Sequence, residues 1–126
     1  MDLPGDLQYT REHEWIRRED DGSLVVGITE YAQDQLGDVV FVEVRPVDTL
    51  VGAGDTIAEV ESTKSVAEVY SPVAGKVLTI NENLMEQPEL VNTDPYGEGW
   101  FAAITPDAEV DDSAWLTADE YRDLTE

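Results

Sequence analysis

The sequence predicts a mainly β fold, a flattened barrel or sandwich of two similar halves with quasi-two-fold symmetry and short helices added to it. Short apolar runs with a period of two alternate with turns that contain glycine, proline or aspartate. The run from Gly37 to Val40 returns as the run from Gly75 to Leu78, 38 residues later, which indicates a weak internal duplication. With 126 residues, 41% of them hydrophobic, the chain can bury one core, so we expect a single domain over 1–126.

The N-terminal part is typical of a hairpin followed by a short helix. A strand is expected over 7–18, a tight turn over 20–22 and a returning strand over 23–28. We expect the helix over 29–37, because Thr29 is a good N-cap and Gly37 can adopt the conformation that commonly follows a last helical turn.

The stretch 38–44 has the strongest strand pattern in the chain. Apolar residues occupy both faces, Val40, Val42 and Val44 on one and Val39 and Phe41 on the other. We therefore expect a central strand that is covered on both sides.

Further strands are expected over 56–62, 66–70 and 76–80 and near 100–104, after a loop over 46–55 that contains a proline and two glycines. The tail predicts a helix over 117–125, because Thr117 and Glu120 have the spacing of a capping box. Leu116 and Tyr121 are placed as a hydrophobic staple. We expect this helix to pack on the domain through Tyr121 and Leu124.

The turn between the strands 56–62 and 66–70 carries Lys64, one of two lysines in the chain; the other is Lys76. This hairpin joins the two similar halves. Its turn is therefore expected at one extreme end of the domain, where a lone lysine side chain is accessible.

The charge balance limits the partners of the protein. Twenty-nine acidic residues against seven basic ones give a formal charge of −22, which repels nucleic acid and anionic membrane surfaces. At molar salt the Debye length falls to about 3 Å, which screens such self-repulsion. We therefore expect no nucleic-acid or membrane partner, and adaptation to a salt-rich cytoplasm. The N-terminus shows no targeting pattern.

The residue types for most site chemistries are missing. There is no cysteine, so any redox chemistry must be imported. His13-Glu14 lacks the second histidine of a helical zinc motif, since Arg17 stands there, and no spaced aspartate loop for calcium occurs. We expect no metal site and no catalytic set. His13, the only histidine, is expected to be exposed or half-packed beside Trp15, although a small enzyme that uses Glu14 and His13 as acid and base stays open.

Several stretches resemble one known family. Glu61–Ser65 and Tyr70–Gly75 resemble the lipoylation site of the glycine cleavage system H-protein family. Four other stretches resemble segments of that family in the same order, and the set extends from about Tyr9 to Tyr121: His13–Trp15, Gly27–Glu43, Asn92–Trp100 and Leu116–Tyr121.

The resemblance implies a barrel-sandwich hybrid with helical additions and a lipoyl group in amide linkage on Lys64. Such a group supplies the sulfur chemistry that the polypeptide lacks. The implied function is that of a carrier without an active site of its own. It takes the aminomethyl group of glycine from the pyridoxal-phosphate glycine decarboxylase (P protein) to the folate-dependent aminomethyltransferase (T protein), and the flavin dihydrolipoyl dehydrogenase (L protein) reoxidises it.

The resemblance also implies roles for five other residues. Glu61 is expected to be recognised by the lipoylating enzyme, and Gly75 to permit the bend that positions the hairpin. Glu14 and Glu68 are expected near a cleft that protects the lipoyl-lysine and its aminomethyl group from water, with Tyr31 as a third contact where some relatives carry histidine. A monomer is expected.

Two related functions remain alternatives. One is a protein of this fold that only relays lipoyl groups. The other is a lipoyl or biotinyl module of another multienzyme system. Biotin sites usually flank the lysine with methionines, and 2-oxo-acid dehydrogenase modules usually have aspartate before it, whereas Thr63 and Ser65 stand here.

Overall fold

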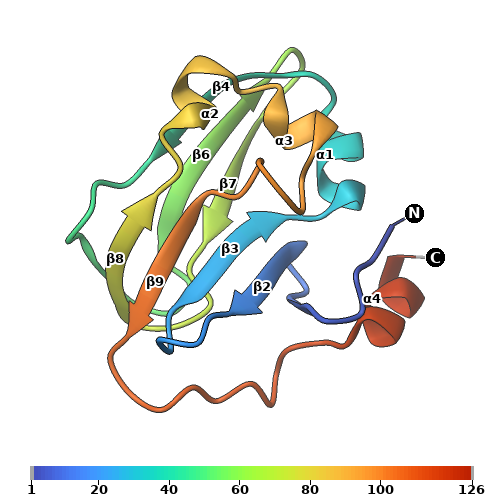
Figure 1. The fold of residues 1–126 in the computed structure, drawn as a ribbon. Helices are drawn as coiled ribbons and strands as arrows, with labels where there is room; N and C mark the ends of the chain where they lie inside the picture. The colour runs from blue at the N-terminus through green and yellow to red at the C-terminus, as the bar shows by residue number, and fades with distance from the viewer. Residues whose placement is uncertain (1, 126) are drawn as a thin grey trace.

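The computed structural model describes residues 2–125 as two antiparallel sheets with helices at their ends (Figure 1). The larger sheet contains, in spatial order, β1 (Gln8–Tyr9), β2 (Glu14–Arg18), β3 (Leu24–Ile28), β9 (Ala102–Pro106), β8 (Gly75–Ile80) and β5 (Leu50–Val51). The smaller sheet contains β4 (Val39–Val44), β6 (Thr56–Ser62) and β7 (Val66–Tyr70). Within residues 2–125 no strand pairing joins the sheets into a closed barrel. The predicted mainly β class is confirmed.

Both predicted helices are present. In α1 (Glu30–Leu36), the Thr29 side chain accepts the N–H of Ala32 at 3.1 Å, and Gly37 ends the helix with φ of 83°. In α4 (Ala118–Thr125) the capping box is formed, since Thr117 N–H donates to the Glu120 carboxylate at 2.9 Å and Glu120 N–H to Thr117 Oγ1 at 3.2 Å. Two short helices were not expected, α2 (Asn83–Glu86) and α3 (Leu90–Thr93).

The staple residues of α4 are both buried, as predicted, but Leu124 is 42% exposed. The expectation that Leu124 packs on the domain is therefore wrong. Tyr121 anchors the apolar side of the helix in a cluster with Tyr9, Trp15 and Leu116, and the half-buried Ala118 packs against the same cluster.

The strand β4 is not central. It forms an edge of the smaller sheet, and a bulge after Val39 changes the register with β6. The bulge turns Val40 and Phe41 outward, where they are 50% and 51% exposed, while Val39 and Val42 stay buried. The strand that is covered on both faces is β3, since Val26 faces one core cluster and Val25 the other.

Two predicted segments are divided differently in the structure. The stretch 46–55 contains the short strand β5. The strand expected over 7–18 is interrupted by a turn between β1 and β2, in which His13 N–H donates to the Thr10 carbonyl at 3.1 Å and His13 has φ of 70°. This turn matters for the site, because it carries Glu12 and His13 toward the smaller sheet.

The predicted duplication has a structural counterpart. Strand β8 has a register shift after Val77, and β4 has one after Val39, 38 positions earlier. The bulge therefore recurs at the spacing that the sequence pattern showed.

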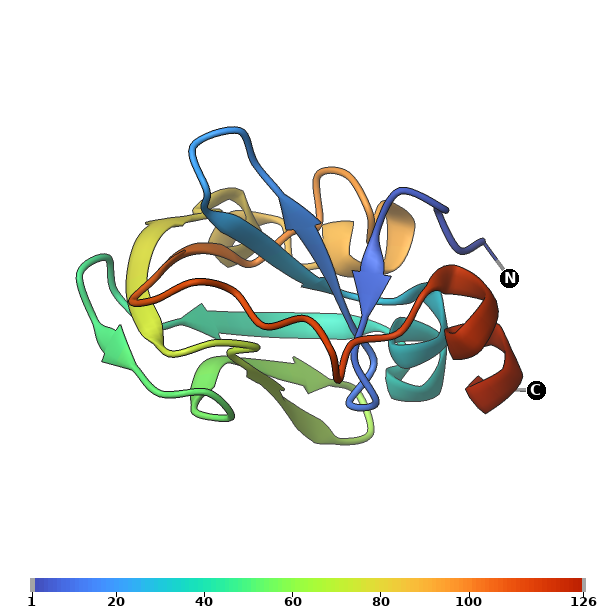
Figure 2. The ribbon, with the colours of Figure 1, turned by 90° about the horizontal axis from the view of Figure 1, so that it is seen from below.

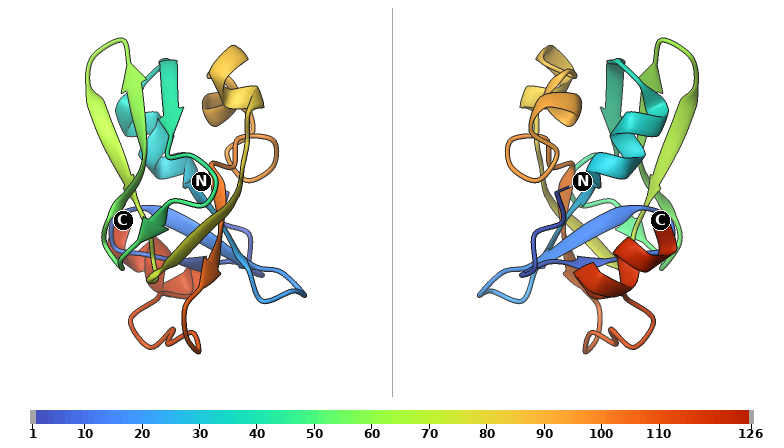
Figure 3. Two further views of the ribbon diagram at one scale, coloured as in Figure 1. Left: turned by 90° about the vertical axis from the view of Figure 1, so that its left-hand side faces the viewer. Right: turned by 90° about the vertical axis from the view of Figure 1, so that its right-hand side faces the viewer.

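The hairpin of β6 and β7 stands at one edge of the molecule, with its turn at the extreme end (Figure 3). The segment after β9 crosses the molecule and ends in α4 beside the N-terminal segment (Figure 2). Backbone hydrogen bonds between Tyr9 and Leu116, at 2.8 and 2.7 Å, hold this segment to β1. Among residues 2–125, no helix has both the length and the apolar character needed to cross a membrane.

Candidate functional site

The turn that carries Lys64 is held by the side chain of Ser62. The buried Ser62 Oγ accepts the N–H groups of Lys64 at 3.2 Å and of Ser65 at 3.1 Å. Ser62 N–H donates to the Ser65 carbonyl at 2.8 Å. These bonds fix the backbone of the turn while the Lys64 side chain stays exposed.

The same turn is attached to the end of α1. Thr63 N–H donates to the Asp38 carbonyl at 3.1 Å. The Lys64 side chain lies over Gly37, where a Cβ would be 3.1 Å from Lys64 Cε. Glycine at this position therefore serves both the positive φ and the approach of the lysine, and the end of a helix is a favourable place for a cation.

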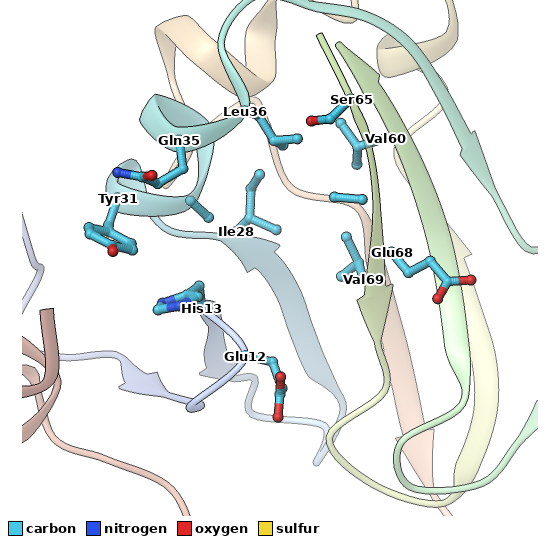
Figure 4. A pocket seen from close by; sticks show the side chains of 12 residues that line it. Glu12, His13, Ile28, Tyr31, Gln35, Leu36, Val60, Ser65, Glu68 and Val69 are labelled. Atoms are coloured by element: carbon cyan, nitrogen blue, oxygen red, sulfur yellow. The ribbon is translucent and has the colours of Figure 1, made fainter.

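A groove of about 410 Å³ lies between α1 and the hairpin (Figure 4). It begins at Ser65, next to Lys64, and its apolar walls come from the inner faces of β3, α1, β6 and β7. The wall residues are Ile28, Ala32, Leu36, Val60, Ala67 and Val69. These apolar walls suit a flexible hydrocarbon chain.

The far end of the groove is polar. Glu12, His13 and Tyr31 lie there, and the rings of His13 and Tyr31 are 4.8 Å apart between centroids. Glu68 forms part of the rim from the edge strand β7; its carboxylate extends away from His13 in Figure 4 and accepts the Tyr70 hydroxyl at 3.3 Å. The predicted Tyr31 and Glu68 thus lie on opposite sides of one groove, but the Glu68 carboxylate turns outward to Tyr70.

Glu14 lies outside this groove. It lines a second pocket of about 560 Å³ with Tyr70 and Trp115, and it is 2% exposed. Its Oε2 accepts the Tyr70 N–H at 2.8 Å and its Oε1 accepts the Thr10 hydroxyl at 2.8 Å. Burial raises the pKa of Glu14, and these two hydrogen bonds oppose the shift. Glu14 joins the turn before β2 to the end of β7.

His13 is half-buried, as expected, but its ring packs against Tyr31 and Tyr121 and lines the groove. Its Nδ1 is 2.7 Å from the Tyr121 hydroxyl, and burial lowers the pKa of the ring. Sequence reasoning also assigned no role to Glu12 or to Gln35, which line the groove. No local sequence pattern identifies the residues at this end of the groove, because tertiary structure brings them together. The contact that orients His13, for example, comes from a residue 108 positions away.

Glu61 and Gly75, expected in lipoylation, lie in different sheets. Glu61 is exposed on the outer face of the smaller sheet, paired with Phe41 on one side and Val66 on the other. Gly75 begins β8, where a side chain would clash with the Thr105 carbonyl of β9. Close strand packing is therefore sufficient to require glycine at 75.

Within the described residues, no group of three or more histidine, aspartate or glutamate side chains could hold a metal ion. The site thus consists of an exposed lysine on a fixed turn and an apolar groove beside it. Residues 7–126 match the family described as Glycine cleavage H-protein. The chain belongs to the glycine cleavage H-protein family.

Individual relatives agree with the family. The chain is 53% identical over 119 residues to the glycine cleavage system H protein of Psychrobacter cryohalolentis, with 94% of each chain covered. It is 51% identical over 121 residues to that of Listeria welshimeri, with 96% of each covered. The crystal structure of a glycine cleavage system H protein from Mycobacterium marinum superposes with a TM-score of 0.88 at 40% identity, covering 98% of each chain.

Membership of the H-protein family gives the function at the level of the system. The chain is the lipoyl-carrying shuttle of glycine cleavage and works with the P, T and L proteins. The resemblance found in the sequence is confirmed. A biotinyl module, or a lipoyl module of a different complex, is excluded.

Substitution of Glu14 by glutamine tests its raised pKa. Because the folded-state pKa lies above the ordinary value of 4.5, the stabilisation from Glu14 is fully present below about pH 4.5 and is lost as pH rises through the folded pKa. Glu14→Gln has no such titration. We expect its free energy of unfolding, relative to the unchanged protein, to increase with pH above about 4.5.

Urea denaturation over a pH series measures this difference, with Glu61→Gln as the control at an exposed carboxylate. Parallel pH profiles for Glu14→Gln and the unchanged protein would contradict the assignment of a raised pKa.

Proposed function

We propose that Lys64 carries the lipoyl group in amide linkage and that the loaded arm, meaning the lipoyl-lysine with its aminomethyl group, lies in the groove between α1 and the hairpin. The observation that carries this proposal is the continuity of lysine and groove. The groove begins at Ser65 and follows β7 to Val69, a distance of about 13 Å at the rise of an extended strand. Its apolar walls match the hydrocarbon part of the arm.

The groove addresses a chemical weakness of the cargo. An aminomethyl group on sulfur can react with water to give ammonia, formaldehyde and the free thiol. Apolar walls exclude water from the carbon–sulfur bond. Carboxylates at the polar end favour the ammonium form of the amine, which has no lone pair to expel the sulfur. Glu12 is in position for this contact at the polar end, the Tyr31 ring forms the neighbouring wall, and Glu68 contributes from the rim.

Glu14 contributes from behind the groove. Its hydrogen bonds to Thr10 and Tyr70 hold the turn that carries Glu12 and His13 against the end of β7. In this proposal the chain supplies binding and shelter, and the enzymes of the system supply the catalytic groups.

Recognition by the lipoylating enzyme is proposed on the outer face of the hairpin. Any enzyme that acylates Lys64 must cover the residues around the turn. Glu61 stands there between two exposed apolar side chains, Phe41 and Val66, which are 51% and 61% exposed. Gly75 acts indirectly, by allowing β8 to pack closely on β9 at the base of the hairpin.

Mass spectrometry of protein from a lipoylating host tests the attachment site. We expect one lipoyl adduct on the unchanged chain and on Lys76→Arg, and none on Lys64→Arg. Lys76 is the matched control because it is the only other lysine and is exposed on β8. An adduct that maps to Lys76, or none on the unchanged chain, would contradict the proposal.

Release of ammonia from loaded protein tests the groove. We expect Glu12→Gln to speed release by about two- to fivefold, the factor that corresponds to roughly 0.4 to 1 kcal/mol for an accessible ion pair. Glu68→Gln should speed release less, because its carboxylate turns outward to the Tyr70 hydroxyl. Glu61→Gln should leave the rate unchanged, because Glu61 is on the outer face of the same hairpin. Equal rates in all three variants would instead favour a chain that only relays lipoyl groups.

We propose that the protein is a cytoplasmic monomer adapted to high salt, without nucleic-acid or membrane partners. Supporting this, Glu43, Glu59 and Glu68 lie side by side across the smaller sheet, and like charges on paired strands repel. Arg45 reaches only two of them, Glu43 at 3.8 Å and Glu59 at 3.5 Å.

Thermal unfolding should therefore occur at higher temperature in molar salt than in dilute buffer. A melting temperature that stays constant or falls across the salt series would refute the salt adaptation, and sedimentation in the same buffers would reveal a dimer.

A further inference from the structure

A chain of hydrogen bonds connects the groove to the C-terminal helix. His13 Nδ1 is 2.7 Å from the Tyr121 hydroxyl, and that hydroxyl is 2.8 Å from Thr29 Oγ1. Thr29 Oγ1 in turn accepts the N–H of Ala32 at 3.1 Å. Tyr121 and Thr29 are both 0% exposed. Three segments that are far apart in the sequence thus meet at one buried chain of polar atoms.

The chain of hydrogen bonds has a preferred direction. The backbone N–H of Ala32 can only donate, so Thr29 Oγ1 accepts at that contact. The other hydrogen-bond partner found for Thr29 Oγ1 among the described residues is the Tyr121 hydroxyl. A fully buried hydroxyl proton without an acceptor is costly, so the Thr29 hydroxyl donates to Tyr121. The Tyr121 proton then points to His13.

This direction decides the protonation of the imidazole. If Tyr121 donates to His13 Nδ1, that nitrogen carries no proton, and the proton of the neutral ring is on Nε2. Burial supports this state, since it lowers the pKa of His13 and raises that of Tyr121 to about 12, while the nearby Glu12 carboxylate pulls the pKa of His13 upward. The Tyr31 ring packs against the imidazole at an angle of 39° between the ring planes.

The backbone at His13 also helps to fix the orientation of the imidazole ring. His13 has φ of 70°, in the left-handed region that few non-glycine residues adopt. Its carbonyl accepts the Thr29 N–H at 3.1 Å, beside the side-chain contact. Thr29 therefore holds His13 in two ways. Its N–H binds the His13 carbonyl directly, and its hydroxyl acts on the imidazole ring by way of Tyr121.

We propose that Tyr121 is a positioning residue that, with Thr29, fixes His13 as the Nε2–H tautomer and so as a hydrogen-bond donor at the polar end of the groove. The inference rests on the proposed function for its consequence. An Nε2–H can donate to the lone pair of the neutral amine on the loaded arm. In the loss of ammonia and formaldehyde, this lone pair expels the sulfur. A hydrogen bond from His13 to the lone pair therefore protects those loaded molecules whose amine is neutral and is not held as ammonium by a carboxylate.

Nitrogen NMR of the unmodified full chain tests the tautomer. His13 is the only histidine, so its two ring nitrogens are identified without ambiguity. We expect an unprotonated Nδ1 and a protonated Nε2 in the neutral ring. In Tyr121→Phe we expect a mixture of tautomers, because the donor to Nδ1 is removed. Thr29→Ser keeps the hydroxyl and should keep the single tautomer.

Tyr9→Phe is the matched control. Tyr9 is buried in the same cluster, stacks on Tyr121 at 5.1 Å between centroids and donates its hydroxyl to the Pro4 carbonyl at 2.7 Å. It has no bond to His13, so its variant should keep the tautomer of the unchanged chain. A ring protonated at Nδ1 in the unchanged chain, or equal tautomer ratios in Tyr121→Phe and Tyr9→Phe, would overturn the inference.

A second readout separates this inference from the proposed function. With loaded protein, Tyr121→Phe should release ammonia about two- to fivefold faster than Tyr9→Phe, as expected for loss of one hydrogen bond. If Tyr121→Phe and Tyr9→Phe release ammonia at equal rates while NMR shows the expected tautomers, the protective role of His13 is overturned. Absence of the lipoyl group on Lys64 overturns the proposed function, while the NMR result on unmodified protein still decides the tautomer.

Discussion

The hydrogen bond from the Thr63 N–H to the Asp38 carbonyl joins the turn of the hairpin to the end of α1, and the groove depends on this junction. The groove has one wall on α1 and the other on β6 and β7, so the position of these elements at the turn sets its width next to Lys64. Gly37 supports the junction, because its positive φ ends the helix and the Lys64 side chain lies beside it. The position of Lys64 and the shape of the groove next to it therefore depend on the same contact between the turn and α1.

The polar end of the groove is fixed by contacts that the N-terminal segment makes with β7 and with the C-terminal helix. Glu14 ties the turn before β2 to Tyr70 at the end of β7, and Tyr121 ties His13 to the start of α1. The tail reaches this place by pairing with Tyr9. A carrier needs a rigid site for a flexible arm, and these bonds supply rigidity where the apolar walls end.

The local parts of this arrangement could be predicted from the sequence. Thr29, Gly37 and the Thr117–Glu120 capping box act within one helical turn, so their spacing was sufficient. Lys64 could be found because the turn and its flanking strands lie within a few residues. The position of β4 at an edge could not, because the bulge at Val40 breaks the alternation on which the prediction of a two-sided strand was based. The partners of Glu14 and His13, 56 and 108 residues away, depend on tertiary structure alone.

The central claim is that the loaded arm lies between α1 and β7. Protein loaded from glycine labelled with carbon-13 at its methylene carbon carries a single labelled aminomethyl group, and NMR can detect protons close to it. We expect contacts from this carbon to Ile28, Ala67 and Val69, which line the groove. Contacts to Trp115 or Ala114 of the second pocket, or no contacts with the protein, would contradict it.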